Sequence, residues 1–151
     1  MEDMTIRKIL VPTDFSDAAG GALRIAIGMA RTFQASIELI HVTATVAILP
    51  PPIDVVAFAA MIPDLSQRVQ DHLDEEAKRV RAEGIACETG FAEGTPHAEI
   101  VRRAQDLGVD LIVMGTHGHG GLSHAVLGSV TERVLHRAHC PVLVVPVRPA
   151  S

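Results

Sequence analysis

Residues 111–118 read Leu111-Ile112-Val113-Met114-Gly115-Thr116-His117-Gly118, and this stretch decides the fold. Its first four residues are apolar without interruption, whereas a strand with one face in water alternates apolar and polar residues. The stretch therefore predicts a strand that is covered on both faces. Residues 9–11 and the run Val142-Leu143-Val144-Val145-Pro146-Val147 have the same character. Strands of this kind are typical of parallel sheets that lie between helices.

Outward from this stretch, strands and helices alternate along the chain. Strands are predicted at 9–11, 37–42, 85–91, 111–114 and 142–147. Helical periodicity follows Ser16, runs from Asp64 to Gly84 and from Thr95 to Gly108, and begins again at Ser129. Asp64 with Gln67 resembles a capping box, and Ser129 with Glu132 forms one. The segment 43–63, with prolines at 50–52, fits a short helix or a packed loop equally well.

The order β-α-β-α-β-α-β-α-β predicts an α/β fold with an open, twisted parallel sheet of five strands and helices on both faces. No internal repeat or linker divides the sequence, so residues 1–151 are expected to form one domain. Ligands of such sheets bind outside the carboxyl ends of the strands, at the point where the strand order reverses.

Composition excludes several classes of protein. The chain has 151 residues, 3% aromatic residues with no Trp or Tyr, and a net charge of −5, so neither stacking platforms nor a basic face is available for nucleic acid. Cys87 and Cys140 lie far apart, which argues against a disulfide scaffold and favours a reducing compartment. No apolar run approaches the roughly 20 residues that span a bilayer, and no signal peptide is evident. A cytoplasmic protein with no membrane contact is expected.

Two strand ends carry residues suited to ligand binding. Pro12, Thr13 and Asp14 follow the first strand, while Gly115 to Gly118 follows the fourth and Gly128-Ser129-Val130-Thr131 begins the next helix. Glycines allow close backbone approach to phosphate and positive φ angles. A helix N-terminus and the hydroxyls of Ser129 and Thr131 add hydrogen-bond donors for an anion. Neither a Walker A loop nor the dinucleotide-binding fingerprint is present. Asp14 fits a ribose contact and a simple helix cap about equally.

Four pieces of the sequence resemble the universal stress protein (UspA) family over nearly the whole chain. They are residues 9–16, residues 39–42, residues 110–118, and residues 128–134 continuing through 140–145. The ATP-binding subset of that family carries the motif G-x2-G-x9-G-[S/T], and Gly115, Gly118, Gly128 and Ser129 satisfy its spacing.

The resemblance implies a Rossmann-like sheet of order 3-2-1-4-5, similar to the adenine nucleotide alpha hydrolases, and a homodimer through residues 142–147. It also implies an ATP site, with or without Mg²⁺, or a site for another adenine nucleotide. Asp14 would contact ribose, and Val42 would pack on adenine. The full set of residues implied is Pro12, Thr13, Asp14, Val42, Met114, Gly115, Gly118, Gly128, Ser129, Val130 and Thr131.

The resemblance implies a nucleotide-dependent regulator of the stress response, with no catalytic residues and at most slow ATP hydrolysis. One feature departs from the family pattern: no Lys or Arg lies between Gly115 and Gly128. This favours the alternative of a dimeric interaction module that binds no nucleotide in cells. His117, His119 and His124 lie in the same loop, but no local Cys or carboxylate completes a metal site, so no metal is expected. The last strand is apolar and uncharged, and at a sheet edge it would pair with a second copy.

Overall fold

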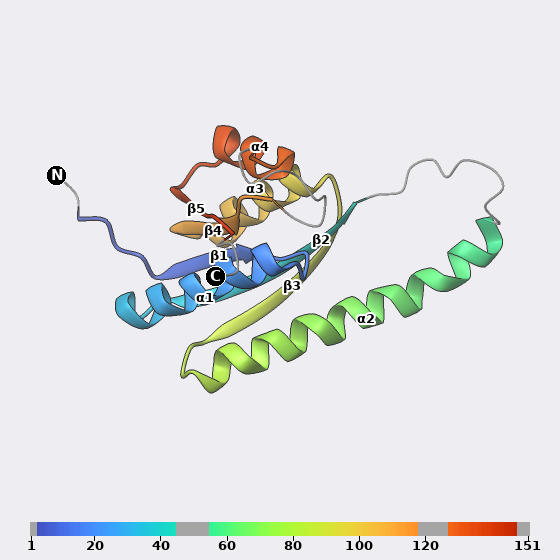
Figure 1. The fold of residues 1–151 in the computed structure, drawn as a ribbon, viewed down its shortest axis with the longest axis horizontal. Helices are drawn as coiled ribbons and strands as arrows, with labels where there is room; N and C mark the ends of the chain where they lie inside the picture. Colours follow the sequence, from blue (N-terminus) through green and yellow to red (C-terminus); the bar gives the residue numbers. More distant parts are fainter. Residues whose placement is uncertain (1–2, 45–54, 118–126, 148–151) are drawn as a thin grey trace.

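The sheet has five parallel strands in the order β3-β2-β1-β4-β5, as a computed structural model of the chain shows (Figure 1). The structure describes residues 3–44, 55–117 and 127–147, with the side chains of residues 55–62 excepted. Its elements are β1 (Lys8–Pro12), α1 (Asp17–Phe33), β2 (Ser36–Ala44), α2 (Val55–Ala82), β3 (Cys87–Gly94), α3 (Pro96–Leu107), β4 (Leu111–Gly115), α4 (Ser129–Arg137) and β5 (Val142–Val145). The predicted α/β fold and the strand order are confirmed.

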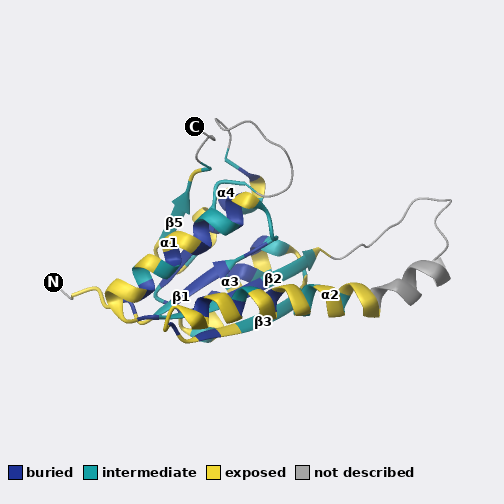
Figure 2. Cartoon of the chain, turned by 60° about the horizontal axis from the view of Figure 1, so that its bottom comes forward, coloured by how far each residue is buried: buried dark blue, intermediate teal, exposed yellow. Residues whose placement is uncertain are grey.

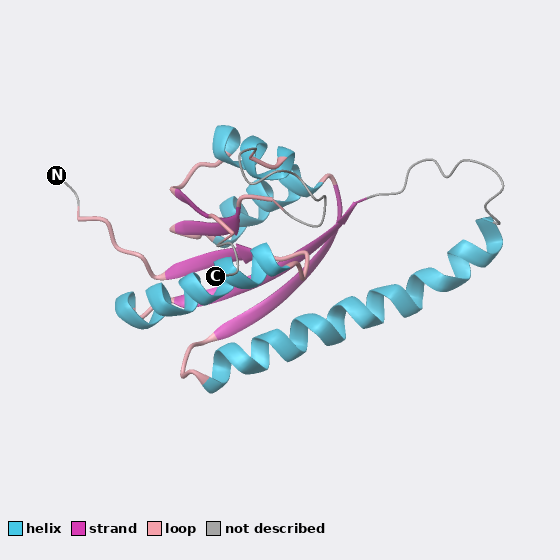
Figure 3. Ribbon diagram, viewed as in Figure 1, coloured by secondary structure: helices cyan, strands magenta, loops and turns pink. Residues whose placement is uncertain are grey.

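Helices cover both faces of the sheet, because alternate side chains of each strand point to opposite sides (Figures 1 and 3). Ile9 and Val11 pack in one cluster with residues of α1 and α2, such as Ala22 and Leu73. Leu10 packs in the other cluster with residues of α3 and α4. The central strands β1 and β4 are therefore buried on both faces, as their unbroken apolar runs predict (Figure 2).

The predicted ends of three helices are confirmed in detail. Ser16 is the N-cap of α1, and its hydroxyl accepts a hydrogen bond from the Ala19 N–H at 3.2 Å. Thr95 is the N-cap of α3 with Pro96 in its first turn, and Gly108 ends that helix in the left-handed conformation at φ 63°. Gly84, just beyond the end of α2, has φ 82°. These are the backbone conformations that Ser, Pro and Gly favour at these positions.

One predicted helix start and one predicted capping box are wrong, although α4 does begin at Ser129 as predicted. Helix α2 begins at Val55, not at Asp64, and Pro63 lies inside it. A three-to-four spacing of apolar residues continues across Pro63, and this longer period overrides the local capping pattern: Phe58, Ile62, Leu65 and Val69. The capping box of Ser129 and Glu132 does not form either. The N-cap of α4 is Gly128, which has no side chain to cap with, and the Glu132 N–H bonds the Gly128 carbonyl at 2.9 Å.

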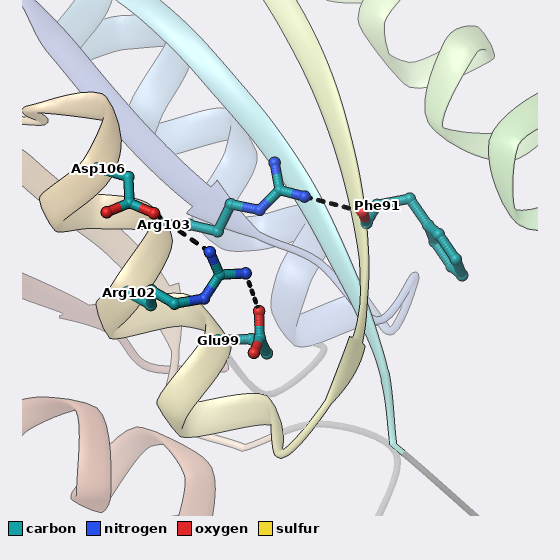
Figure 4. Close-up of polar contacts among 5 residues, drawn as sticks. All are labelled: Phe91, Glu99, Arg102, Arg103 and Asp106. Atoms are coloured by element: carbon teal, nitrogen blue, oxygen red, sulfur yellow. Dashed lines mark hydrogen bonds and ion pairs between the residues drawn. The ribbon is translucent and has the colours of Figure 1, made fainter.

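The edge strand β3 is covered by a side chain of α3 (Figure 4). Arg103 donates from Nη2 to the carbonyl oxygen of Phe91 at 2.9 Å. On the same helix, Arg102 forms ion pairs with Glu99 and Asp106. Such contacts occupy backbone groups that would otherwise remain open at a sheet edge. Among the helices that the structure describes, none is long and apolar enough to cross a membrane.

Candidate functional site

A cavity of about 340 Å³ lies at the carboxyl ends of the strands, where the strand order reverses between β1 and β4. Ten of the eleven residues implied by the sequence line it. The eleventh, Gly118, lies outside the described residues, as do His119 and His124. The lining consists of Pro12, Thr13, Asp14, Ala19, Val42, Pro96, Ile100, Met114, Gly115, His117, Gly128, Ser129, Val130 and Thr131.

The segment after β1 is held by its own hydrogen bonds. The buried Thr13 donates from its backbone N–H to the Ile40 carbonyl at 2.8 Å, and its hydroxyl oxygen accepts from the Phe15 N–H at 3.0 Å. Asp14 Oδ1 accepts from the Ser16 N–H at 3.0 Å. Since Ser16 itself caps α1, Asp14 is not the helix cap. Its carboxylate is fixed at the cavity wall by a local turn.

A second part of the cavity lining comes from the end of β4 and the start of α4. Thr131 is 3% exposed and donates from Oγ1 to the Gly115 carbonyl at 2.8 Å. The hydroxyl hydrogen of Thr131 is thus used within the protein, to bind the end of β4 to the first turn of α4. The Gly128 N–H bonds the Thr116 carbonyl at 2.7 Å and closes the segment further.

Gly115 and Gly128 serve close packing. A Cβ atom on Gly115 would lie 3.0 Å from both the Cβ and the carbonyl oxygen of Ala18. A Cβ on Gly128 would lie 3.0 Å from the Thr116 carbonyl oxygen and the His117 Cα. Neither glycine has a positive φ, so conformational freedom is not what these two positions require. The need is steric: β4, α1 and α4 approach too closely for any side chain.

The start of α4 lines the cavity with backbone donors that the helix itself leaves without an acceptor. Ser129, Val130 and Thr131 form its first turn, and their N–H groups have no acceptor within the helix. The N-terminal end of the helix dipole carries partial positive charge, which favours an anion. In the same cavity, Val42, Met114 and Ile100 supply apolar surface. The cavity thus combines a carboxylate, an apolar wall and an anion-favouring helix end.

The sequence did not point to three of the lining residues as ligand contacts, Ala19, Pro96 and Ile100, whereas His117 was considered among the loop histidines beside a phosphate. Pro96 begins the helix after β3, at the same edge of the sheet as Asp14, so its place at a strand end was a signal for it. His117 Nδ1 lies 3.1 Å from Thr116 Oγ1. Within the described part of the chain, no group of three His, Cys, Asp or Glu side chains could hold a metal ion.

Two buried titratable groups lie beside the site or in the core. His97, next to Pro96, has a lowered pKa because of burial and the nearby guanidinium groups of Arg137 and Arg133. Arg137 Nη1 lies 3.0 Å from His97 Nε2, so the arginine donates and the imidazole accepts. Burial raises the pKa of the Cys87 thiol to about 11. A thiol of that pKa is protonated at neutral pH and is not a nucleophile.

Residues 5–146 match the Universal stress protein family. The universal stress protein MJ0531 of Methanocaldococcus jannaschii is 39% identical over 139 residues, which cover 92% of this chain and 81% of that protein. The solved structure of protein MJ0577 superposes with a TM-score of 0.84 at 33% identity, over 97% of this chain and 99% of that one. The universal stress protein UspA of Lactobacillus plantarum superposes with a TM-score of 0.82 at 28% identity, over 95% and 99% of the two chains.

Proposed function

Since the chain belongs to the universal stress protein family, we propose that its switch-point cavity binds an adenine nucleotide, ATP with or without Mg²⁺ being the first candidate. The observation that carries the proposal is that Asp14, the apolar side chains of Val42 and Met114, and the start of α4 all line one cavity. Each part of a nucleotide has a matching group in this lining. The ribose hydroxyls can donate to the Asp14 carboxylate, the flat base can pack on Val42 and Met114, and the phosphates can bind at the helix N-terminus.

Two structures with the same fold support the choice of base. One is a universal stress protein in complex with cAMP, and the other is the universal stress protein of Archaeoglobus fulgidus in complex with dAMP. At 24% and 20% identity, their likeness to this chain is one of fold. Gly118 belongs to the proposed phosphate segment by its place in the motif.

The role that follows is regulatory. We propose a cytoplasmic protein whose state depends on bound nucleotide, with no catalytic residues and at most slow hydrolysis of ATP. Phosphoryl transfer depends on a cationic clamp on the phosphates. The sequence between Gly115 and Gly128 contains no Lys or Arg to supply one.

Thermal unfolding with and without 5 mM ATP tests the binding. A ligand at about 100 times its Kd stabilises a fold by about 2.7 kcal/mol, which raises the Tm of a domain of this size by roughly 5–10 °C. GTP is expected to raise the Tm less. Asp14→Asn should remove most of the rise, whereas Asp17→Asn makes the same charge change at an exposed residue outside the cavity and should keep it. No rise with any adenine nucleotide, or equal rises in both variants, would contradict the proposal.

A homodimer through β5 is the second part of the proposed function. The strand is half-buried, uncharged and at the edge of the sheet. The carbonyls of Pro141 and Val145 accept hydrogen bonds from the N–H groups of Ile112 in β4 and of Thr116 just after it. By alternation, the backbone groups of Val142 and Val144 face outward. A second copy of β5, paired antiparallel about a two-fold axis, would satisfy them. The same dimer would also be formed by the alternative candidate, an interaction module that binds no nucleotide.

Sedimentation equilibrium at 20 μM tests the dimer. Val144→Pro removes an outward N–H without removing a bond to β4, so it should shift the protein toward monomer. A monomeric wild type at this concentration would exclude the interface.

A further inference from the structure

A second cavity, of about 430 Å³, lies on the face of the sheet that α2 covers. It shares no lining residue with the first cavity. Its walls come from the turn before α1, the ends of β2 and β3, and the stretch of α2 between Leu65 and His72. The lining consists of Phe15, His41, Thr43, Ala44, Leu65, Ser66, Arg68, Val69, His72, Phe91 and Glu93. A volume of this size suits a small molecule.

Four rings of this lining form a near-parallel stack that we call the ring ladder: His72, Phe15, His41 and Phe91. Their centroids are 4.4 Å, 5.0 Å and 6.2 Å apart in this order, with interplanar angles of 11°, 20° and 16°. Each ring comes from a different part of the fold: α2, the turn after β1, β2 and β3. The rings of the ladder therefore lie nearly parallel, and all four belong to the lining of the cavity. The faces of Phe15 and His41 are covered by their neighbours in the stack, so a flat aromatic molecule would stack on one of the two end rings, His72 or Phe91, at a similar centroid separation.

The ring ladder is held in place before any ligand binds. Phe15 has φ 65°, a strained conformation for a bulky residue, and such strain gathers at functional sites. His41 donates from Nδ1 to the Thr13 carbonyl at 2.8 Å, which fixes the plane of its ring. The backbone of Phe91 is held by Arg103, and its ring points away from α3 toward the α2 side (Figure 4).

The polar groups of the lining decide the charge of the ligand. Arg68 carries a positive charge and Glu93 a negative one, so the charges of these two side chains cancel. Thr43 and Ser66 add hydroxyl groups that can donate or accept. A charged ligand would therefore be attracted by one of these side chains and repelled by the other. A neutral ligand can stack on a ring and form a hydrogen bond with a hydroxyl group.

We propose that this second cavity is a binding site for an uncharged, planar aromatic molecule of one or two fused rings that carries a hydroxyl or ring N–H group. The site is separate from the proposed nucleotide site, and the proposal does not rest on nucleotide binding.

Titration with 2-naphthol at pH 8 tests the site. The protein has no Trp or Tyr, so the fluorescence of the probe is observed without an aromatic protein background. Saturable binding at one site per chain is expected, and 5 mM ATP should leave it in place. His72→Ala and Phe91→Ala should each weaken binding about three- to tenfold, by the loss of a stacking ring. His72 is exposed on α2, so its replacement by Ala leaves the core intact. Phe33→Ala deletes an exposed ring of α1 outside both cavities and should change nothing.

Three results would overturn the proposal. They are no saturable binding up to 1 mM 2-naphthol, displacement of the probe by ATP, or wild-type affinity in both His72→Ala and Phe91→Ala. The failure of nucleotide binding would show instead as a missing rise of the Tm with ATP while 2-naphthol still binds. Each proposal can therefore be contradicted without affecting the other.

Discussion

Gly115→Ala should destabilise the protein, although Ala is the smallest possible addition. The new Cβ would lie 3.0 Å from the Ala18 Cβ, 3.0 Å from the Ala18 carbonyl oxygen and 3.1 Å from its carbonyl carbon. Favourable contacts between carbon atoms lie near 3.5–4.0 Å, so these are about half an ångström too short. Two of the three neighbours are backbone atoms at the start of α1, which cannot rotate away. Overpacking of this kind costs about 1–3 kcal/mol.

Gly28→Ala is the matched control, and the opposite sign is expected for it. Gly28 lies within α1 and is exposed, and a Cβ there would meet nothing within 4 Å. Replacing Gly by Ala inside a helix raises the free energy of unfolding by about 0.5–1 kcal/mol, because Ala has fewer backbone conformations than Gly in the unfolded chain.

Urea unfolding followed by circular dichroism measures both free energies. A loss of 1–3 kcal/mol for Gly115→Ala corresponds to a Tm lower by roughly 2–12 °C. The reasoning fails if Gly115→Ala is as stable as the wild type, or if Gly28→Ala is destabilised to the same extent. The first result would mean that α1 can yield to a Cβ on Gly115, and the second that the loss does not come from the contact with Ala18.

Two further changes test individual contacts. Ser16→Ala should lower the free energy of unfolding by about 1 kcal/mol in urea unfolding, since it removes the bond to the Ala19 N–H, whereas Thr95→Ala should cost less because the Thr95 side chain makes no capping bond. The lowered pKa of His97 means that the unfolded chain binds more protons below about pH 6.5, so stability should fall as the pH drops from there. His97→Gln keeps an acceptor for Arg137, and urea unfolding across pH 7.5–5 should show a shallower decline for it; equal slopes would show that His97 does not contribute.

The alternation of apolar runs and helical periods was enough to predict the sheet. A strand such as β4 consists of apolar residues and is buried on both faces, so its sequence pattern alone indicates its environment. Local capping signals were less dependable. Ser16 and Thr95 cap the predicted helices, but Ser129 does not, because Gly128 already occupies the capping position. The start of α2 was also missed, since a proline normally ends a helix and Pro63 does not.

Within the proposed nucleotide site, the sequence predicted which strand ends would meet but not how their groups are used. Asp14, Gly115 and Gly128 are recognisable from their spacing. That Gly115 is needed for contact with Ala18, and that the Thr131 hydroxyl bonds the Gly115 carbonyl, depends on how closely two helices approach one strand. Such distances are set by packing between elements that are far apart in the sequence, so the local sequence does not predict them.

The sequence by itself determined the α/β class, the sites of helix termination at Gly84 and Gly108, and the strand ends at which a ligand would bind. All of these follow from short-range periodicity and from the conformational preferences of single residues. Only the tertiary structure decided that His72, Phe15, His41 and Phe91 stack in one ladder. These residues lie in four separate elements and share no spacing in the sequence. Their meeting is a consequence of the parallel register of β2 and β3 and of the position of α2 across them, and it exists only once the chain has folded.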